Sequence, residues 1–212
     1  KSNHLILGAE MFESDNQEGL DLYLKDSITF TEFDTTVRLW NNYKTDYKPL
    51  VDYAKFNSLP FIATNIPRRY AALVHKNGGF SALDSLNSRE KSWMAPLPIP
   101  FDPDIPSYKA MLQMFAGHGH PDMIKAQASK DATMAYFILK NWQENHMFLH
   151  FNGSYHSNNY EGILWYINAQ NPQIKCGTIS TVNQQNIQQL NKEFIGLADY
   201  IIVVDNDMIK TY

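Results

Sequence analysis

The sequence predicts an α/β fold in which a mostly parallel central sheet is flanked by helices. Short apolar runs alternate with stretches of helical periodicity along the 212-residue chain. Strands that are separated by helices pair in parallel, because each helix crosses over a face of the sheet and covers it. The length is enough for one core and too short for two ordinary domains. We therefore expect a single α/β domain.

Five short apolar runs are expected to form the strands of this sheet. The first, LILGAEMF, contains no helix start signal, and Glu10 lies at its carboxyl end. The others are similarly short and are separated by helical stretches. The five runs span residues 5–12, 59–65, 147–152, 174–181 and 200–205.

The stretches between these runs carry the start and stop signals of helices. Ser14 or Asp15 can cap the first helix, Pro67 can begin the helix after the second strand, and Gly78 with Gly79 can end it. The longest helix is expected to be the main core helix, because its apolar residues approximate one face. Helices are predicted over residues 14–24, 31–40, 46–56, 67–77, 108–115, 122–145 and 159–167.

The composition changes between about residues 82 and 120. Its prolines are spaced too closely for a regular helix and indicate an extended wall segment. We expect residues 1–212 to form one domain with this helical and Pro-rich segment as an insertion. The prolines are Pro96, Pro98, Pro100, Pro103 and Pro106.

Charge and cysteine content narrow the class of function. The net charge of −4 and the scattered Lys and Arg leave no basic stripe, so no nucleic-acid partner is expected. Cys176 is the single cysteine and cannot form an internal disulfide or a thiolate cage. No apolar run approaches the length of a membrane span, and the first residues lack a signal-peptide pattern. The mature chain is expected either to be soluble or to lack an anchoring segment.

In open parallel sheets ligands bind outside the carboxyl ends of the strands. Polar residues at these ends are therefore the candidates for a functional site. They are Glu10, Asn65 with Arg68 and Arg69, residues 152–156, Thr181 and residues 205–207.

Glu10 and the two arginines form the first candidate group. A carboxylate that follows a buried strand needs a cation or a hydrogen-bond donor, and Arg68 and Arg69 are natural partners. Pro67 at a helix start places both guanidiniums beside backbone donors, where a phosphate, carboxylate or haem propionate could bind. The alternative is that Glu10 pairs with an arginine as a structural contact only, or that the arginines are simply solvated.

The turn GSYH at residues 153–156 forms the second group. We expect Gly153 to supply backbone freedom and His156 to point into the cleft as a ligand or general base. Tyr155 could bind ferric iron as a phenolate. The alternative is that His156 only caps or hydrogen-bonds. In the first interpretation, replacing His156 by Ala weakens ligand binding and leaves thermal stability nearly unchanged.

Two further features of the sequence are weaker indications of a functional site. His118 and His120 lie two residues apart and could meet a metal, although such a pair in a loop usually has no role. Asp131 is the residue of potential interest on the helix segment 125–135, whose small residues indicate close packing against the sheet. The motifs GxSxG, CxxC and HExxH and the Walker loop do not occur.

Four segments, in this order, resemble the ChaN-like family of iron-regulated haem-binding lipoproteins. The resemblance covers residues 5–212 and implies an α/β fold shared with erythromycin esterases and Tiki-type metalloproteases. The segments are LGAEMFESDNQEGLDLYL, RLWNNYKTDYKPLVDYAKFNSLPFIATNIPRRYA, KAQASKDATMA and FNGSYHSNNYEGILWY.

The resemblance implies a haem- or iron-binding protein of the cell envelope that takes part in iron acquisition. It implies a tyrosine phenolate on the iron, here Tyr155, with His156 as a second candidate ligand, and two monomers that sandwich their haems. Glu10, Arg68 and Arg69 complete the expected cofactor-binding set. It further implies a lipoprotein of the periplasm or outer membrane, anchored by a lipid on a preceding segment.

The wider group implies an alternative, a metal-dependent hydrolase of the erythromycin esterase or Tiki type. In that reading Glu10 after LGA, His156 of the GxxH turn and Arg69 after NIP are catalytic, with a divalent metal as cofactor. Relatives begin with a strand that carries a Gly-Glu-x-His motif and with a following helix. This βα unit is not present in residues 1–212, so these residues are not expected to complete a hydrolytic site.

Overall fold

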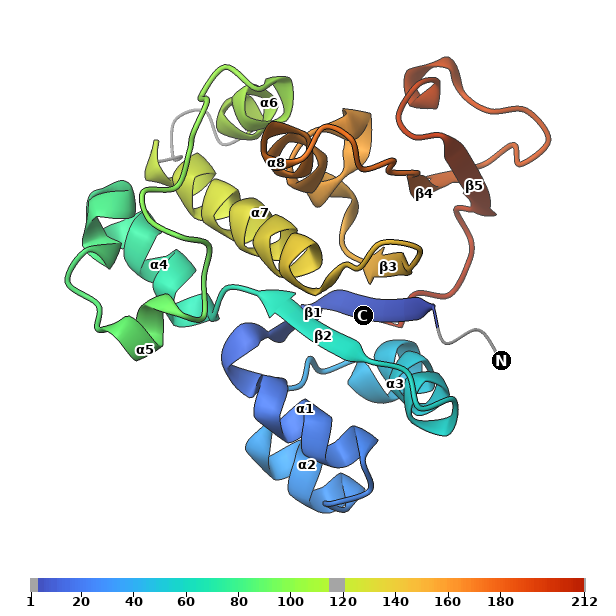
Figure 1. Cartoon of the computed structure of the whole chain (residues 1–212). Helices are drawn as coiled ribbons and strands as arrows, with labels where there is room; N and C mark the ends of the chain where they lie inside the picture. The colour runs from blue at the N-terminus through green and yellow to red at the C-terminus, as the bar shows by residue number, and fades with distance from the viewer. Residues whose placement is uncertain (1–3, 115–120, 212) are drawn as a thin grey trace.

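The computed structural model describes residues 4–114 and 121–211 and confirms the predicted fold class (Figure 1). Three parallel strands form the central sheet in the order β2-β1-β3. Ala9 of β1 lies opposite Ala63 of β2 and opposite Phe151 of β3. The strands are β1 Leu5–Glu13, β2 Phe61–Asn65 and β3 Met147–Phe151.

One face of the central sheet is covered by the first helices of the chain, which lie below it in Figure 1. Leu7 and Ala9 of β1 point to this face and pack into a core with Leu20, Phe33 and Val51. The side chain of Thr29 caps α2 in a capping box with Glu32, which fixes the start of that helix. The helices are α1 Gln17–Leu24, α2 Phe30–Thr36 and α3 Lys48–Phe56.

The opposite face is covered by α7, with α4 and α8 packed against it. Small side chains on α7, among them Ala128, Ala132 and Ala135, are buried and allow close packing, as the sequence predicted. This helix ends at Asn141, earlier than expected, because Trp142 has extended backbone angles. The helices are α4 Arg68–Lys76, α7 Asp122–Asn141 and α8 Ile163–Gln170.

The Pro-rich segment packs onto the helices of this second face. Met94 and Ile99 join the core beneath α4 and α7, and Tyr108 is buried in a smaller cluster with Ile124 of α7. Gly78 and Gly79 have positive φ and end α4, as expected. The segment contains α5 Ser88–Lys91 and α6 Pro106–Met114.

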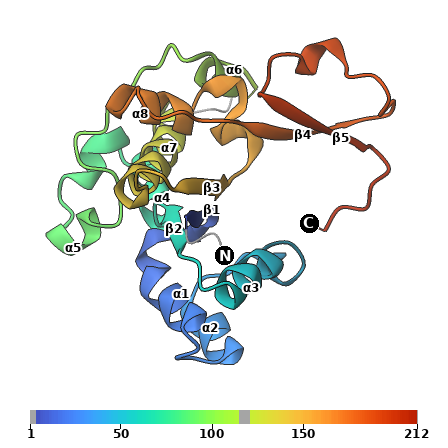
Figure 2. The ribbon, with the colours of Figure 1, turned by 45° about the vertical axis from the view of Figure 1, so that its right-hand side comes forward.

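The last two strands differ from the expectation, because they form a separate two-stranded parallel sheet. Ile179 pairs with Tyr200, and Figure 2 shows this sheet extending away from the central one. Along β4 exposed and buried residues alternate, which is typical of a half-covered sheet and not of a central buried strand. Thr181 and Asp205 therefore do not belong to the sheet edge that carries Glu10. The strands are β4 Ile179–Gln184 and β5 Tyr200–Asp205.

Short helical turns connect these elements. None of the helices that the structure describes is both long and apolar enough to cross a membrane. The turns are η1 Ser14–Asn16, η2 Tyr43–Tyr47, η3 Gly79–Leu83, η4 Ser154–His156, η5 Asn158–Tyr160 and η6 Lys192–Phe194.

Candidate functional site

The candidate site lies at the carboxyl end of the central sheet, where three elements meet. Glu10 follows Ala9, the last residue of β1 that pairs with β3. The turn η4 follows β3 and brings His156 over this edge. Asp131 reaches the same point from the middle of α7. Glu10 and His156 retain only 8% and 5% of their exposure, and Asp131 retains none.

The imidazole of His156 is held between two carboxylates. Its Nδ1 lies 2.5 Å from Oδ1 of Asp131, and its Nε2 lies 3.2 Å from Oε1 of Glu10. Both ring nitrogens must carry a proton to donate to these oxygens, so His156 is an imidazolium. We call Glu10, Asp131 and His156 the buried triad.

The remaining oxygens of the buried triad are also occupied. Oε2 of Glu10 accepts the backbone N–H of Gly153 at 2.8 Å, and Oδ2 of Asp131 accepts the hydroxyl of Tyr108 at 2.8 Å. Nε2 of Gln127 lies 3.0 Å from Nδ1 of His156, but two donors face each other there, so this contact adds no hydrogen bond to the imidazolium. Every charge of the triad is thus paired, as buried charges must be.

The pKa values agree with this arrangement. Burial alone would raise the pKa of Glu10, but the hydrogen bond and positive charge of His156 outweigh it and lower that pKa to about 2. Burial alone would lower the pKa of His156, but the charge and hydrogen bond of Asp131, together with Glu10, raise it to about 9. At neutral pH Glu10 is therefore a carboxylate and His156 is an imidazolium.

These pKa shifts predict how stability depends on pH. The stabilisation of the folded state by His156 is fully present below the unfolded pKa of 6.5 and is lost as the pH rises through about 9. The contribution of Glu10 is present above its unfolded pKa of 4.5 and is lost as pH falls through about 2. We expect the free energy of unfolding, measured with urea, to decline from about pH 6.5 to about pH 9. A value that stays constant across this window would contradict the charged state of His156.

Of the two glycines near His156, only Gly162 is required by the geometry of the turn. Gly153 has an ordinary φ of −65°, so the expected need for backbone freedom is wrong. A Cβ there would lie 3.4 Å from Oε2 of Glu10, an ordinary van der Waals contact, so the space around the carboxylate does not require a glycine either. Gly162 has φ +55°, and a Cβ there would lie 2.4 Å from the carbonyl oxygen of His156. The close packing of the turn thus depends on Gly162.

Sequence reasoning missed a second histidine beside the triad. Nε2 of His150 lies 2.7 Å from Oγ1 of Thr64, and its Nδ1 lies 3.0 Å from Oδ1 of Asn152. Burial lowers the pKa of His150 to about 4, so it is neutral at physiological pH. His150 lies inside the apolar run MFLHFN and pairs with Gly8 of β1, so only the order of the strands shows that its side chain reaches Thr64 on β2. Gln127 and Tyr108 were missed for the same reason, since their contacts depend on tertiary packing.

The two arginines do not join the triad in the part of the chain that the structure describes. Arg69 pairs with Asp15 at 2.6 Å, and its guanidinium lies 4.4 Å from the ring centroid of Tyr70. Arg38 pairs with the same aspartate. Arg68 is exposed on the first turn of α4. The expected contact between Glu10 and an arginine is replaced by the contact between Glu10 and His156.

Tyr155 is placed quite differently from its neighbour His156. It keeps 58% of its exposure, and its hydroxyl lies 3.8 Å from Sδ of Met114, which is 66% exposed. The turn thus directs the imidazole inward and leaves the phenol accessible. A ligand that approaches this edge of the molecule can reach the phenol oxygen.

Metal ligation by the expected histidines finds little support in the geometry. Across residues 4–114 and 121–211, no group of three or more His, Cys, Asp or Glu is arranged to hold a metal ion. His118 and His120 lie outside the described residues. Glu10 and His156 do meet, as the hydrolase alternative requires, but their polar atoms are occupied within the triad and by Gly153. Neither is free to act as a general base in this conformation.

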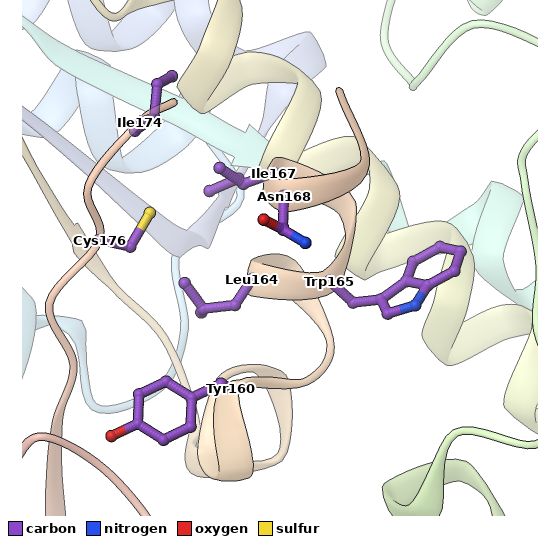
Figure 3. Close-up of a pocket in the computed structure, with 7 residues that line it drawn as sticks. All are labelled: Tyr160, Leu164, Trp165, Ile167, Asn168, Ile174 and Cys176. Carbon is purple, nitrogen blue, oxygen red and sulfur yellow. The ribbon is translucent and has the colours of Figure 1, made fainter. Parts of the chain in front are cut away.

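A cavity of about 290 Å³ lies beside α8, apart from the triad. Figure 3 shows Leu164, Ile167 and Asn168 of α8 facing Ile174 and Cys176 of the following segment. Glu10, Tyr155 and His156 do not line it. Its volume lies just below the range of about 300–1,000 Å³ that is usual for small-molecule sites.

Comparisons with known proteins place the chain in a family. A family model described as "Haem-binding uptake, Tiki superfamily, ChaN" matches residues 1–167, which include the triad and Tyr155. A solved structure, "Cofacial heme binding to ChaN of Campylobacter jejuni", is similar in fold with a TM-score of 0.64 and 16% sequence identity. The alignment covers 93% of this chain and 72% of that chain. The search of curated proteins found no match.

Proposed function

Because the chain belongs to the haem-binding ChaN family of the Tiki superfamily, we propose that it binds ferric haem through the phenol of Tyr155. The observation that carries the proposal is the contrast within one turn. Tyr155 is accessible, whereas both ring nitrogens of His156 are engaged with carboxylates. Of the two expected iron ligands, only the phenol can reach iron without breaking a buried ion pair.

The chemistry around Tyr155 suits this ligand. A tyrosine phenolate is an established axial ligand of haem iron, and it supplies a negative oxygen that favours the ferric state. Met114 offers an exposed thioether beside the phenol, and such a flexible apolar side chain can pack on the face of a porphyrin. The cavity beside α8 is too small for the whole macrocycle, so the haem would lie on the surface at η4.

The remaining members of the expected set have different roles in this proposal. Arg68 and Arg69 would bind the propionates, for which Arg69 would exchange its contact with Asp15. Glu10 would support the turn through Gly153 and would not touch the haem.

Titration of the protein with ferric haem tests the proposal. We expect a shifted Soret band and a phenolate-to-iron charge-transfer band that saturate at one haem per chain. Protoporphyrin without iron is the control, since it can stack on the surface but cannot bind a phenolate. A ferric haem spectrum that remains that of free haem in the presence of excess protein would defeat the proposal.

The cofacial arrangement named for the Campylobacter jejuni protein motivates a proposal about assembly. We propose that two copies of this chain bring their haems face to face, because a haem bound at the exposed Tyr155 keeps one apolar face in water. The molar mass measured by light scattering should double when ferric haem is added. Iron-free protoporphyrin should leave it unchanged. A haem-loaded protein that stays monomeric at micromolar concentration would refute the assembly without affecting the ligand.

We also propose, from family membership alone, that the protein serves iron acquisition at the cell envelope, as a lipoprotein. Growth on haem as the source of iron, compared between the parent strain and a strain that lacks the protein, tests this role. Equal growth of the two strains would contradict it.

A further inference from the structure

We infer that His156 is the positioning residue that fixes the turn presenting Tyr155, and that it is not itself an iron ligand. The inference rests on the proposed function, because Tyr155 is the proposed contact with iron. It gives the buried triad a structural role, which follows neither from the family match nor from the similarity to the solved structure. Three features of the geometry support it.

The first feature is that His156 has no lone pair to offer. Both nitrogens face carboxylate oxygens, at 2.5 Å on the side of Asp131 and at 3.2 Å on the side of Glu10. Turning the ring towards a surface ligand would leave two buried carboxylates without their cation. Removing one partner of a buried ion pair is strongly unfavourable. His156 is therefore held where it is.

The second feature is that the turn is anchored on both sides of Tyr155. Before it, the N–H of Gly153 donates to Oε2 of Glu10 at 2.8 Å. After it, the backbone N–H of His156 donates to the carbonyl of Gly153 at 3.0 Å, and the ring joins β1 to α7. Glu10 thus binds both ends of the turn, one through each carboxylate oxygen.

The third feature is the rigidity of the anchor itself. Asp131 is fully buried, and the hydroxyl of Tyr108 fixes its second oxygen. Gly162 packs against the carbonyl of His156 with no room for a Cβ. By contrast, within residues 4–114 and 121–211 the phenol oxygen of Tyr155 has only a weak contact, with Sδ of Met114 at 3.8 Å. The direction of the phenol is therefore set by the backbone of the turn, and the triad sets that backbone.

The first test uses the protein without haem. In His156→Gln, an amide can bond to one carboxylate but cannot bridge both, so the turn should open more often. We expect the amide of Gly153 to exchange with deuterium at least about tenfold faster than in the wild type. His75→Gln, a change of an exposed histidine on α4, is the matched control and should exchange like the wild type. Unchanged exchange in a folded His156→Gln variant would overturn the inference.

The second test uses ferric haem. A residue that holds a metal ligand in place without touching the metal usually contributes to metal affinity, and its replacement weakens that affinity by about 10- to 100-fold. His156→Gln should therefore weaken haem binding by about that factor and reduce the charge-transfer band at saturation. His75→Gln should keep both. Retention of wild-type affinity and of the full band in His156→Gln would overturn the inference while leaving Tyr155 as the ligand.

If His156→Gln does not fold, Asp131→Asn tests in its place whether the buried triad positions the turn. Asparagine keeps the shape of the buried side chain but weakens its bond to Nδ1 of His156. Faster exchange at Gly153 and a weaker charge-transfer band would support the inference, and wild-type values of both would overturn it. Absence of the band from the wild-type complex would instead contradict the proposed function, and the exchange result would still report on the turn.

Discussion

Replacing Tyr155 by Phe is expected to abolish the phenolate-to-iron charge-transfer band and to weaken ferric haem binding more than about 100-fold. The loss should exceed about 100-fold, because replacing a residue that only holds a metal ligand in place already lowers metal affinity by about 10- to 100-fold. The ring of Phe keeps the apolar contact with the porphyrin but offers no oxygen to the iron. Absorption titrations of the two proteins with ferric haem measure both effects. Stability should hardly change, since Tyr155 is 58% exposed.

Tyr160→Phe is the matched control for this substitution. Tyr160 is also exposed and lies in η5, the next turn of the chain, where its hydroxyl donates to Asp199 at 3.1 Å. The control should retain the charge-transfer band. If Tyr160→Phe loses the band and Tyr155→Phe retains it, the ligand has been assigned to the wrong tyrosine.

Replacing Asp131 by Ala is expected to lower the free energy of unfolding by about 3–5 kcal/mol, the usual cost of breaking a buried ion pair. The change leaves the imidazolium of His156 with one carboxylate and leaves the hydroxyl of Tyr108 without its acceptor. Both groups are buried, so water cannot replace the lost contacts without rearrangement. Urea unfolding followed by tryptophan fluorescence measures the loss.

Asp104→Ala is the control for Asp131→Ala. Asp104 is exposed and pairs with Lys109 at 2.9 Å on the surface, where an ion pair contributes at most about 1 kcal/mol. If the two substitutions lower the free energy of unfolding equally, the buried triad contributes no more to stability than a surface ion pair, contrary to what its geometry implies.

The burial of His156 revises an expectation from the sequence. The turn GSYH predicted a ligand-facing histidine whose loss would leave stability nearly unchanged. In the structure the ring lies between two carboxylates and is 5% exposed, so its removal should destabilise the fold. Sequence reasoning placed the residue at the correct strand end, because parallel strands bring their carboxyl ends together. It could not tell whether the side chain points inward, since that depends on Asp131 of α7.

The strand assignments show a similar limit. The apolar runs of β1, β2 and β3 are short and mostly buried, and the helices between them fix their parallel pairing. The runs of β4 and β5 resemble them in the sequence, yet they form a second sheet. Which strands pair is decided by contacts between distant residues, and a local apolar pattern does not encode these contacts.

The arginines illustrate why charge pairs were harder to predict than strand ends. Arg69 had two acidic candidates near the sheet edge, and the sequence offered Glu10 as its partner. The structure pairs Arg69 with Asp15 and gives Glu10 to His156. Burial explains the difference, because the half-exposed guanidinium stays hydrated beside Asp15 while the compact imidazole fits the closed space at Glu10.

The most direct test of a Tyr155 phenolate on iron is the resonance Raman spectrum of the ferric haem complex, excited within the charge-transfer band. The wild-type protein and His75→Gln should show the ring modes of an iron-bound tyrosinate, and Tyr155→Phe should lack them. Tyrosinate modes that persist in Tyr155→Phe, or a wild-type spectrum without them, would contradict ligation of the iron by Tyr155.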